Sequence, residues 1–192
     1  FLFNTTSLTG IQSSGNTASG NRSTAMGENT TASGTSSTAM GVDTAASGSH
    51  STAMGESTTA SGDTSTTTGQ STTASGNIST AMGESTTASG ISSTAMGENT
   101  TASGTSSTAM GNETEAVGAS STAMGESTTA SGDYSTVMGQ NTTASGESST
   151  AMGQYNVLNT GDNPTSYDAT NTAFSVGNGT SEGSRSDAFK VL

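Results

Sequence analysis

Glycine recurs at every seventh residue from Gly20 to Gly153, twenty times without an insertion or a deletion. The residue before the glycine alternates, mostly between Met and Ser, so the full repeat is fourteen residues long. Ser-Thr-Ala-Met-Gly (23–27) and Thr-Thr-Ala-Ser-Gly (30–34) form one such unit. All nine methionines occupy the same slot, and Thr68 fills the one gap in that series. A fixed period predicts a repeat architecture, in which each unit buries its face against its neighbours.

The composition alone is typical of a disordered chain, because only 27% of the residues are hydrophobic and 4% are aromatic. The periodicity argues against disorder, since a flexible linker has no reason to keep methionine at every fourteenth position. A net charge of −12 disfavours nucleic acid and anionic membranes as partners. The chain has no cysteine and no apolar stretch near the roughly 20 residues of a membrane helix. Its abrupt ends lead us to expect a segment of a longer protein.

Seven residues accommodate a strand of about five residues and a tight turn. Two half-repeats then make one coil of two strands, stacked on the next coil at about 4.8 Å. A coiled coil is excluded, because a glycine at every seventh position would cost about 1 kcal/mol each in a helix. We therefore predict an all-β parallel solenoid of 14-residue coils. We expect the glycines to supply the positive φ or the close backbone approach of the turns. These turn glycines include Gly27, Gly34, Gly41, Gly55, Gly62, Gly97 and Gly104.

Side chains in a strand alternate between two faces, so each half-repeat has an inner and an outer set. Slots two and four before the glycine hold Ala and Ser or Thr, and slots one and three hold Thr with Met or Ser. Glu115 occupies the third slot before Gly118, and a carboxylate inside so thin a coil would have no partner. The Ala-containing set is thus expected inside; the alternative is a monomeric solenoid with methionine inside. The predicted interior includes Ala25, Ala32, Ala39, Ala53, Ala60, Ala95 and Ala102.

An outward row of methionines is an apolar surface that favours association. A core of alanine methyls contributes about 0.8 kcal/mol per buried carbon, against roughly 1–2 kcal/mol of backbone entropy per ordered residue. A monomer built this way is not expected to be stable alone, so we predict self-association through the methionine face.

The alternation of Ser-Thr-Ala-Met-Gly with Thr-Thr-Ala-Ser-Gly resembles the head repeats of the trimeric autotransporter adhesins, the YadA-like heads. Their motif alternates Asn/Ser-Ser-Val-Ala-Ile-Gly with Ser-x-Ala-x-Gly, and the resemblance covers about residues 14–153. In that family the Ala-Ile-Gly strand faces the three-fold axis of a left-handed parallel β-roll. The resemblance implies a homotrimer at the bacterial cell surface, anchored in the outer membrane through a C-terminal part outside this chain. The implied trimer interface is Met26, Met40, Met54, Met82, Met96, Met110, Met124, Met138 and Met152. Thr and Met in place of Val and Ile make this interface more polar and more pliable.

Three regions follow from the repeat: a lead-in or cap over 1–13, the head over 14–153 and an irregular closing segment over 154–192. The register breaks after Gly153, because the next glycine, Gly161, comes one residue late. Gly161–Pro164 is typical of a turn. We expect a bulkier inner strand over 171–177 and a final apolar strand over 186–192. The stretch 176–192 is similar to segments that close the heads of trimeric adhesins and tail fibres.

No catalytic constellation emerges from the sequence. His50 is the only histidine, so a Ser-His-Asp triad cannot be assembled. Asp162, Asn163 and Asp168 lack the spacing of a calcium loop. The glycines are not followed by the lysine of a phosphate-binding loop. We predict a protein that is not an enzyme and that uses neither a cofactor nor a metal.

The leading hypothesis is a non-enzymatic adhesin head that binds extracellular matrix or a cell-surface receptor with a repetitive polar surface. One alternative is a threonine array that binds ice, although Glu115, Val117 and Tyr134 would interrupt it. Another is a phage or secretion tail fibre. The slot after Ala-Met-Gly alternates mostly between acidic residues such as Glu56 and neutral ones such as Gln70. This alternation spaces like charges by about 10 Å and limits their repulsion; the other interpretation is an edge that binds basic partners.

Overall fold

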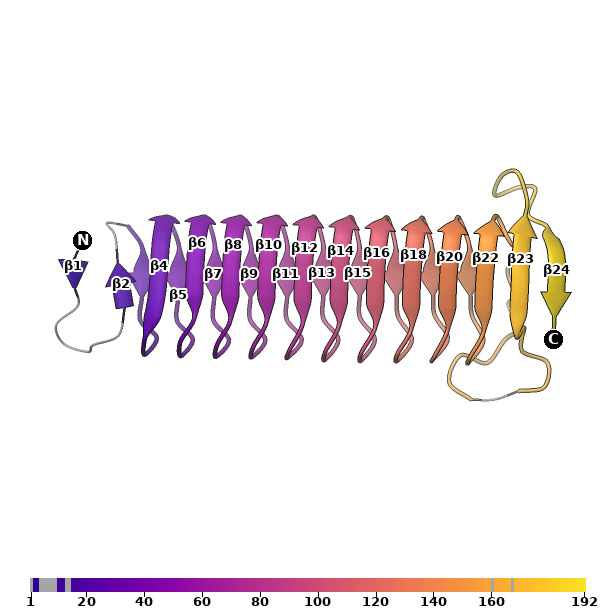
Figure 1. The fold of residues 1–192 in the computed structure, drawn as a ribbon, viewed down its shortest axis with the longest axis horizontal. Coiled ribbons are helices and arrows are strands. Elements are labelled where there is room, and N and C mark those ends of the chain that lie inside the picture. Colours follow the sequence, from indigo (N-terminus) through magenta and orange to yellow (C-terminus); the bar gives the residue numbers. More distant parts are fainter. Residues whose placement is uncertain (1, 4–9, 13–14, 160, 167) are drawn as a thin grey trace. The chain divides into compact units, whose positions relative to one another are not determined.

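The computed structural model describes residues 2–3, 10–12, 15–159, 161–166 and 168–192. The chain divides into two compact units, Phe1–Ser92 and Ser93–Leu192. Each unit is a parallel β-solenoid, in which long and short strands alternate along the chain and form two separate sheets (Figure 1). The predicted lead-in over 1–13 lies largely outside the described residues, and its described parts are the strands β1 and β2.

In the first unit, the long-strand sheet runs in the order β1, β2, β4, β6, β8, β10 and β12. All neighbours pair in parallel except β1 and β2. Its strands are β1 (Leu2–Phe3), β2 (Gly10–Gln12), β4 (Ser23–Glu28), β6 (Thr38–Val42), β8 (Thr52–Glu56), β10 (Thr66–Gln70) and β12 (Thr80–Glu84). The second sheet holds β3 (Thr17–Ala18), β5 (Thr31–Ala32), β7 (Ala45–Ala46), β9 (Thr59–Ala60), β11 (Thr73–Ala74) and β13 (Thr87–Ala88).

The second unit repeats this plan and ends in an antiparallel hairpin. Its long strands are β14 (Thr94–Glu98), β16 (Thr108–Asn112), β18 (Thr122–Glu126), β20 (Thr136–Gln140), β22 (Thr150–Gln154), β23 (Phe174–Asn178) and β24 (Asp187–Val191). Its short strands are β15 (Thr101–Ala102), β17 (Glu115–Ala116), β19 (Thr129–Ala130) and β21 (Thr143–Ala144). Up to β22, pairing between successive coils of this unit joins each residue to the one fourteen positions later, as in Met110↔Met124. The solenoid of 14-residue coils predicted from the glycine spacing is therefore confirmed.

The two strands of a coil differ in length, although the sequence led us to expect about five residues in each. Strands of the methionine half span five or six residues, whereas those of the serine half span two. The short ladder ends because two consecutive amides share one acceptor. The amides of Ser33 and Gly34 both donate to the carbonyl of Ala46, at 2.9 and 3.2 Å. The chain then turns.

The repeated glycines act through close backbone approach. An added Cβ at Gly55 would lie 2.0 Å from the carbonyl oxygen of Gly69, and one at Gly34 would lie 2.0 Å from that of Gly48. Gly55 also has a φ of +123°, which favours glycine. No side chain fits at either kind of position without separating the coils.

The placement of the glycines corrects one expectation. Gly27, Gly41, Gly55 and Gly97 lie inside long strands, and the bend follows them. Gly34, Gly62 and Gly104 do lie at the start of a turn. Non-glycine residues two positions later adopt the left-handed conformation, as Ser36 and Ser57 do with φ of 55°. Backbone hydrogen bonds between equivalent turns hold these strained residues in place. In one of them, the Ser57 N–H donates to the Val42 carbonyl at 2.9 Å.

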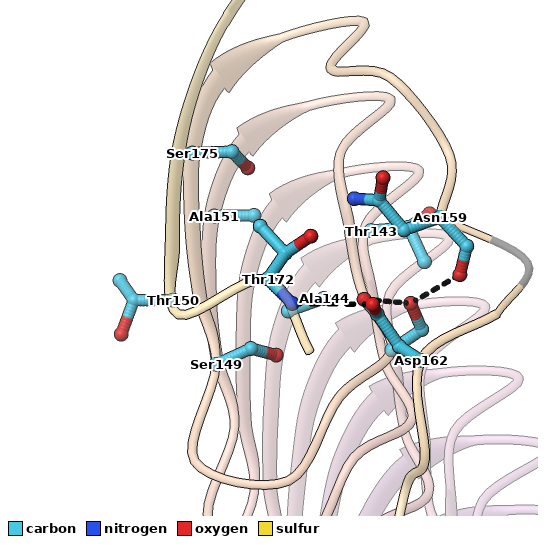
Figure 2. Close-up of a pocket in the computed structure, with 10 residues that line it drawn as sticks. Thr143, Ala144, Ser149, Thr150, Ala151, Asn159, Asp162, Thr172 and Ser175 are labelled. Atoms are coloured by element: carbon cyan, nitrogen blue, oxygen red, sulfur yellow. Dashed lines mark hydrogen bonds between the residues drawn. The ribbon is translucent and has the colours of Figure 1, made fainter. Parts of the chain in front are cut away.

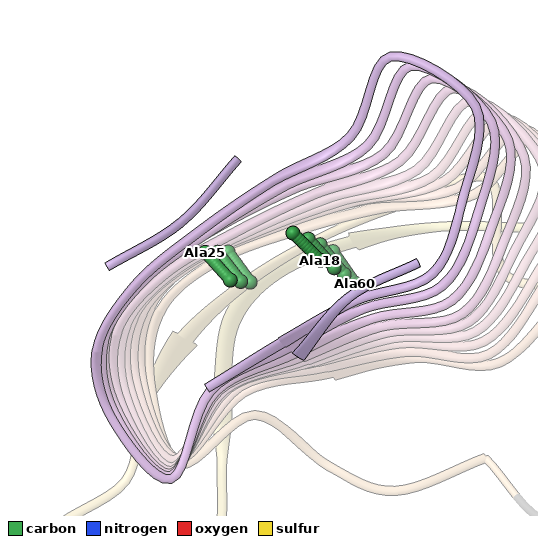
Figure 3. Close-up of a cluster of buried hydrophobic side chains, with 7 residues drawn as sticks. Ala18, Ala25 and Ala60 are labelled. Carbon is green, nitrogen blue, oxygen red and sulfur yellow. The ribbon is translucent and has the colours of Figure 1, made fainter. Parts of the chain in front are cut away.

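The interior of each coil is lined by alanine together with serine or threonine. All seven alanines that the sequence assigns to the interior are fully buried, and Ser51, Thr58 and their equivalents are buried with them. Figure 3 shows two rows of these methyl groups inside the first unit, one containing Ala25 and the other containing Ala18 and Ala60. Glu115 is exposed, as its slot requires. The core is thin, and small side chains fill it.

We expect Ala95→Leu to destabilise the protein by about 1–3 kcal/mol, because the fully buried Ala95 has no space around it for three more carbons. Thermal unfolding measures the effect. The matched control is Ser103→Leu, since Ser103 is exposed on the short-strand side of the same coil. Equal melting temperatures for the two variants would contradict the assignment of the faces.

Candidate interaction surface

The outward face of the long strands carries two regular rows, which we call the Thr/Met face. Parallel pairing in register aligns Thr with Thr and Met with Met in successive coils, as in Thr108↔Thr122 and Met110↔Met124. Met26 and Met82 are 43% and 37% exposed, and the other seven methionines are half-buried. Every methionine that the sequence assigns to an interface therefore lies on this one face of its unit. The face presents apolar thioethers and threonine methyls to the surroundings.

The outward face of the short strands is polar and less regular. Thr59 and Ser61 represent its usual pair, but Ala45, Glu115 and Val117 interrupt the rows. Val117 is 42% exposed. Tyr134, the third residue expected to disturb a threonine array, lies in a turn and is 61% exposed.

The Thr/Met face ends in larger apolar side chains. Pairing of β22 with β23 places Phe174 beside Thr150 and Val176 beside Met152. The antiparallel strand β24 then places Val191 beside Phe174 and Phe189 beside Val176. The rings of Phe174 and Phe189 make an edge contact with centroids 6.0 Å apart. The bulky side chains expected in an inner strand here lie on the outward face instead, because Ser175 occupies the buried slot.

A loop between β22 and β23 covers the short-strand side of the last coil (Figure 2). Asp162 organises it: one carboxylate oxygen accepts from the Ser145 hydroxyl at 3.0 Å, and the other accepts from the Thr172 amide at 3.1 Å. The Ser145 hydroxyl also lies 3.0 Å from the carbonyl of Asn159. In the same loop, hydrogen bonds from the Thr170 amide and hydroxyl lower the pKa of Asp168. These aspartates therefore stabilise the loop.

Two buried asparagines occupy the inner threonine slot at the ends of the repeat. Asn156 accepts from the Thr143 amide at 2.8 Å and donates to the Thr143 carbonyl at 2.8 Å. In a regular coil the equivalent amide, that of Thr129, donates to a backbone carbonyl, that of Thr142. The side-chain amide of Asn156 thus takes the place of the backbone groups that a further coil would supply to Thr143. Asn16 similarly accepts from the Thr30 amide at 2.9 Å and donates to the Gly27 carbonyl at 2.7 Å.

Sequence reasoning did not single out these asparagines, although the 14-residue register held the signal. Position 16 precedes Thr30 by one repeat, and position 156 follows Thr142 by one repeat. A change from Thr to Asn at an otherwise constant slot marks the two ends.

The turns after the long strands carry acidic side chains that contact amides or hydroxyls one coil away. Glu126 accepts from the Gln140 amide at 3.0 Å, and Glu56 accepts from that of Gln70 at 3.4 Å. Glu113 accepts from the Ser127 hydroxyl at 2.8 Å. In each of these pairs a carboxylate faces a neutral side chain in the next coil. The pairs therefore agree with the alternation of acidic and neutral residues in the sequence.

Among the described residues, no group of three His, Cys, Asp or Glu side chains is arranged to hold a metal ion. His50 is exposed in a turn with a φ of 58°. The described part of the chain also contains no helix with the length and apolar character that a membrane span requires.

A comparison with protein-family models matches the YadA head domain repeat over residues 18–44, 46–66, 88–114, 116–142 and 130–156. These segments cover more than half of the chain. The chain belongs to the YadA head repeat family. A comparison with curated proteins gave no match. The resemblance seen in the alternating motifs is confirmed, and the YadA head repeat corresponds here to one long and one short strand per coil.

We expect Asn156→Ala to expose the end of the YadA head repeats to local opening. The Thr143 amide and carbonyl would both lose their partner, and each buried group left unpaired costs about 1–3 kcal/mol. Hydrogen exchange of the Thr143 amide should accelerate, and the melting temperature should fall. Thr165→Ala, at an exposed loop position, is the control. Unchanged exchange at Thr143 would contradict the capping role of Asn156.

Proposed function

We propose that this chain is the head of a homotrimeric surface adhesin and that three copies meet through their Thr/Met faces. The observation that carries the proposal is the outward row of methionines in each unit, which Thr68 interrupts once in the first unit. Burial of such a side chain contributes about 1.5–3 kcal/mol before entropy costs. A three-fold axis places identical side chains together, and uncharged Thr and Met rows are compatible with that symmetry. Membership of the YadA head repeat family further supports the trimer, its left-handed coil and an outer-membrane anchor outside this chain.

The adhesive contacts are assigned to the surfaces that remain outside such a trimer. These are the short-strand face, with residues such as Thr59 and Ser61, and the turns between strands. Most coils repeat the same polar pair, and the trimer presents that pattern three times. Weak individual contacts to extracellular matrix or to a cell-surface receptor then add up through multivalency. The proposal includes no catalytic step, cofactor or metal.

Met96→Asp tests the trimer interface. Three carboxylates would meet in a water-poor core, where like charges cannot all ionise, so the trimer should dissociate at pH 7. The crowded carboxylates would have a raised pKa in the trimer, so the trimer would bind protons more readily than the free chain. Trimer stability should therefore increase as the pH falls, and assembly should partly recover near pH 4.

Light scattering or native mass spectrometry measures the oligomeric state of this variant. The matched control is Ser103→Asp, on the exposed short-strand side of the same coil, and it should assemble normally. A parent chain that is a folded monomer at micromolar concentration would refute the proposed interface, as would a Met96→Asp variant that stays trimeric at pH 7.

Adhesion is tested with the same proteins on immobilised extracellular matrix and on cultured cells. The trimer should bind at least about tenfold more tightly than the Met96→Asp chain at pH 7, because three linked surfaces act together. Trimeric protein that binds neither surface at micromolar concentration would refute the adhesive role and leave the trimer intact.

A further inference from the structure

The regular Thr/Met face allows two copies of the chain to associate in more than one axial register. Within each unit, displacing one copy by a single coil, about 4.8 Å, again places Met opposite Met and Thr opposite Thr. Such a shift leaves only one terminal layer unpaired. In the first unit the same shift places Thr68 of the displaced copy opposite Met54 or Met82 of its neighbours. The contact between Thr68 residues is then replaced by contacts between Thr68 and Met. The repeated rows therefore specify which face associates but select weakly among axial registers.

The C-terminal hairpin supplies side chains that break this regularity on the same face. Phe174, Val176, Phe189 and Val191 continue the Thr and Met rows beyond Thr150 and Met152, and we call these four residues the apolar key. Phe189 is 55% exposed and Val191 is 41% exposed. Their neighbour Lys190 is directed to the other side, where its ammonium group donates to Asn159 Oδ1. The outward side of the hairpin is thus apolar and uncharged.

The apolar key is held firmly on the last coil, as a register device requires. The Arg185 guanidinium donates to the Asn141 carbonyl at 2.9 Å and lies over the Tyr155 ring at 5.8 Å. The Ser186 amide donates to the Tyr155 carbonyl at 3.1 Å, and the Gln154 side chain donates to the Gly179 carbonyl at 2.9 Å. These bonds join the loop of the hairpin to the solenoid. A preorganised surface loses little entropy on binding.

We propose that the apolar key packs against the keys of two other copies of this chain and thereby sets the axial register of the trimer. This inference rests on the proposed trimer. Its occupant is a second copy because the key continues the rows that are proposed to face the axis, and because identical uncharged side chains can meet around a three-fold axis. A shift by one coil would bring Phe174 and Val176 beside a Thr and Met layer of a neighbour, and it would leave the outermost Phe189 layer incompletely packed.

Disulfide trapping measures the register directly, because the chain contains no cysteine. Two single-cysteine proteins, Met110→Cys and Met124→Cys, differ by one coil. They carry distinguishable tags, are refolded together and are then oxidised. Mass spectrometry counts the links. A trimer in register gives 110–110 and 124–124 links, whereas a trimer shifted by one coil gives 110–124 links.

The experiment is repeated with Phe189→Thr and Val191→Thr added to both proteins. Threonine favours strands and already occupies both rows of this face, as Thr150 and Thr68 do, so the fold should persist. We expect the fraction of 110–124 links to rise about tenfold or more, as two large apolar contacts are lost. Lys190→Thr, on the same strand but on the other side, should leave the fraction unchanged. Circular dichroism verifies folding, and Phe189→Thr alone serves if the double variant unfolds.

The outcomes separate this inference from the proposed function. A trimeric double variant that still gives only same-layer links would overturn the role of the key, including the case in which another partner occupies it. A monomeric parent chain would remove the proposed trimer together with its register. A parent trimer with abundant 110–124 links would keep the trimer and remove the key.

Discussion

Close contact between the backbones of successive coils is the constraint on which this structure depends. A Cβ added at Gly41 would lie 1.9 Å from the carbonyl oxygen of Gly55, so the coils keep their spacing only if this position stays glycine. The same contact recurs at equivalent glycines of the serine half, such as Gly62. Because each coil repeats the one before it, the residues at all the remaining positions of the repeat are also aligned in rows along the solenoid. The outward methionine row is thus a consequence of the glycine columns.

The thin interior explains why the outward face matters. Alanine methyls contribute little burial energy, and the hydroxyls of Thr58 and Thr72 lie inside without a hydrogen-bond partner in the protein. Stability within a coil then depends mainly on the backbone ladders and on the bonds between turns. Half-buried methionines such as Met96 retain apolar surface that only a further partner can cover. This balance supports the proposed association more directly than the composition does.

Much of this fold could be predicted from the sequence, because the strand and turn pattern of one 14-residue repeat applies to every other repeat. Strand alternation and the single carboxylate of Glu115 were enough to assign the inner and outer faces. The unequal strand lengths were not predicted, since they depend on two amides sharing the Ala46 carbonyl. Two closing strands were expected over 171–177 and 186–192, and the structure has β23 and β24 there. Their antiparallel pairing, the outward position of Phe174 and the capping role of Asn156 were missed, because they lie where the period stops and periodic reasoning carries no information there.

In the proposed trimer, the repeats and the ends of the solenoid contribute differently to association. Met is flexible and polarisable, so a row of methionines tolerates small misfits that a row of β-branched side chains would resist. That tolerance suits an interface of many equal layers, but it also lowers the difference in energy between one register and the next. Specificity has to come from side chains that occur once. On the Thr/Met face the larger of these are Phe174 and Phe189 with their valine neighbours, fixed to the last coil through Arg185. In the proposed trimer, the repetitive Thr/Met face gives the contact area, and the aromatic hairpin, whose side chains occur once, gives the alignment.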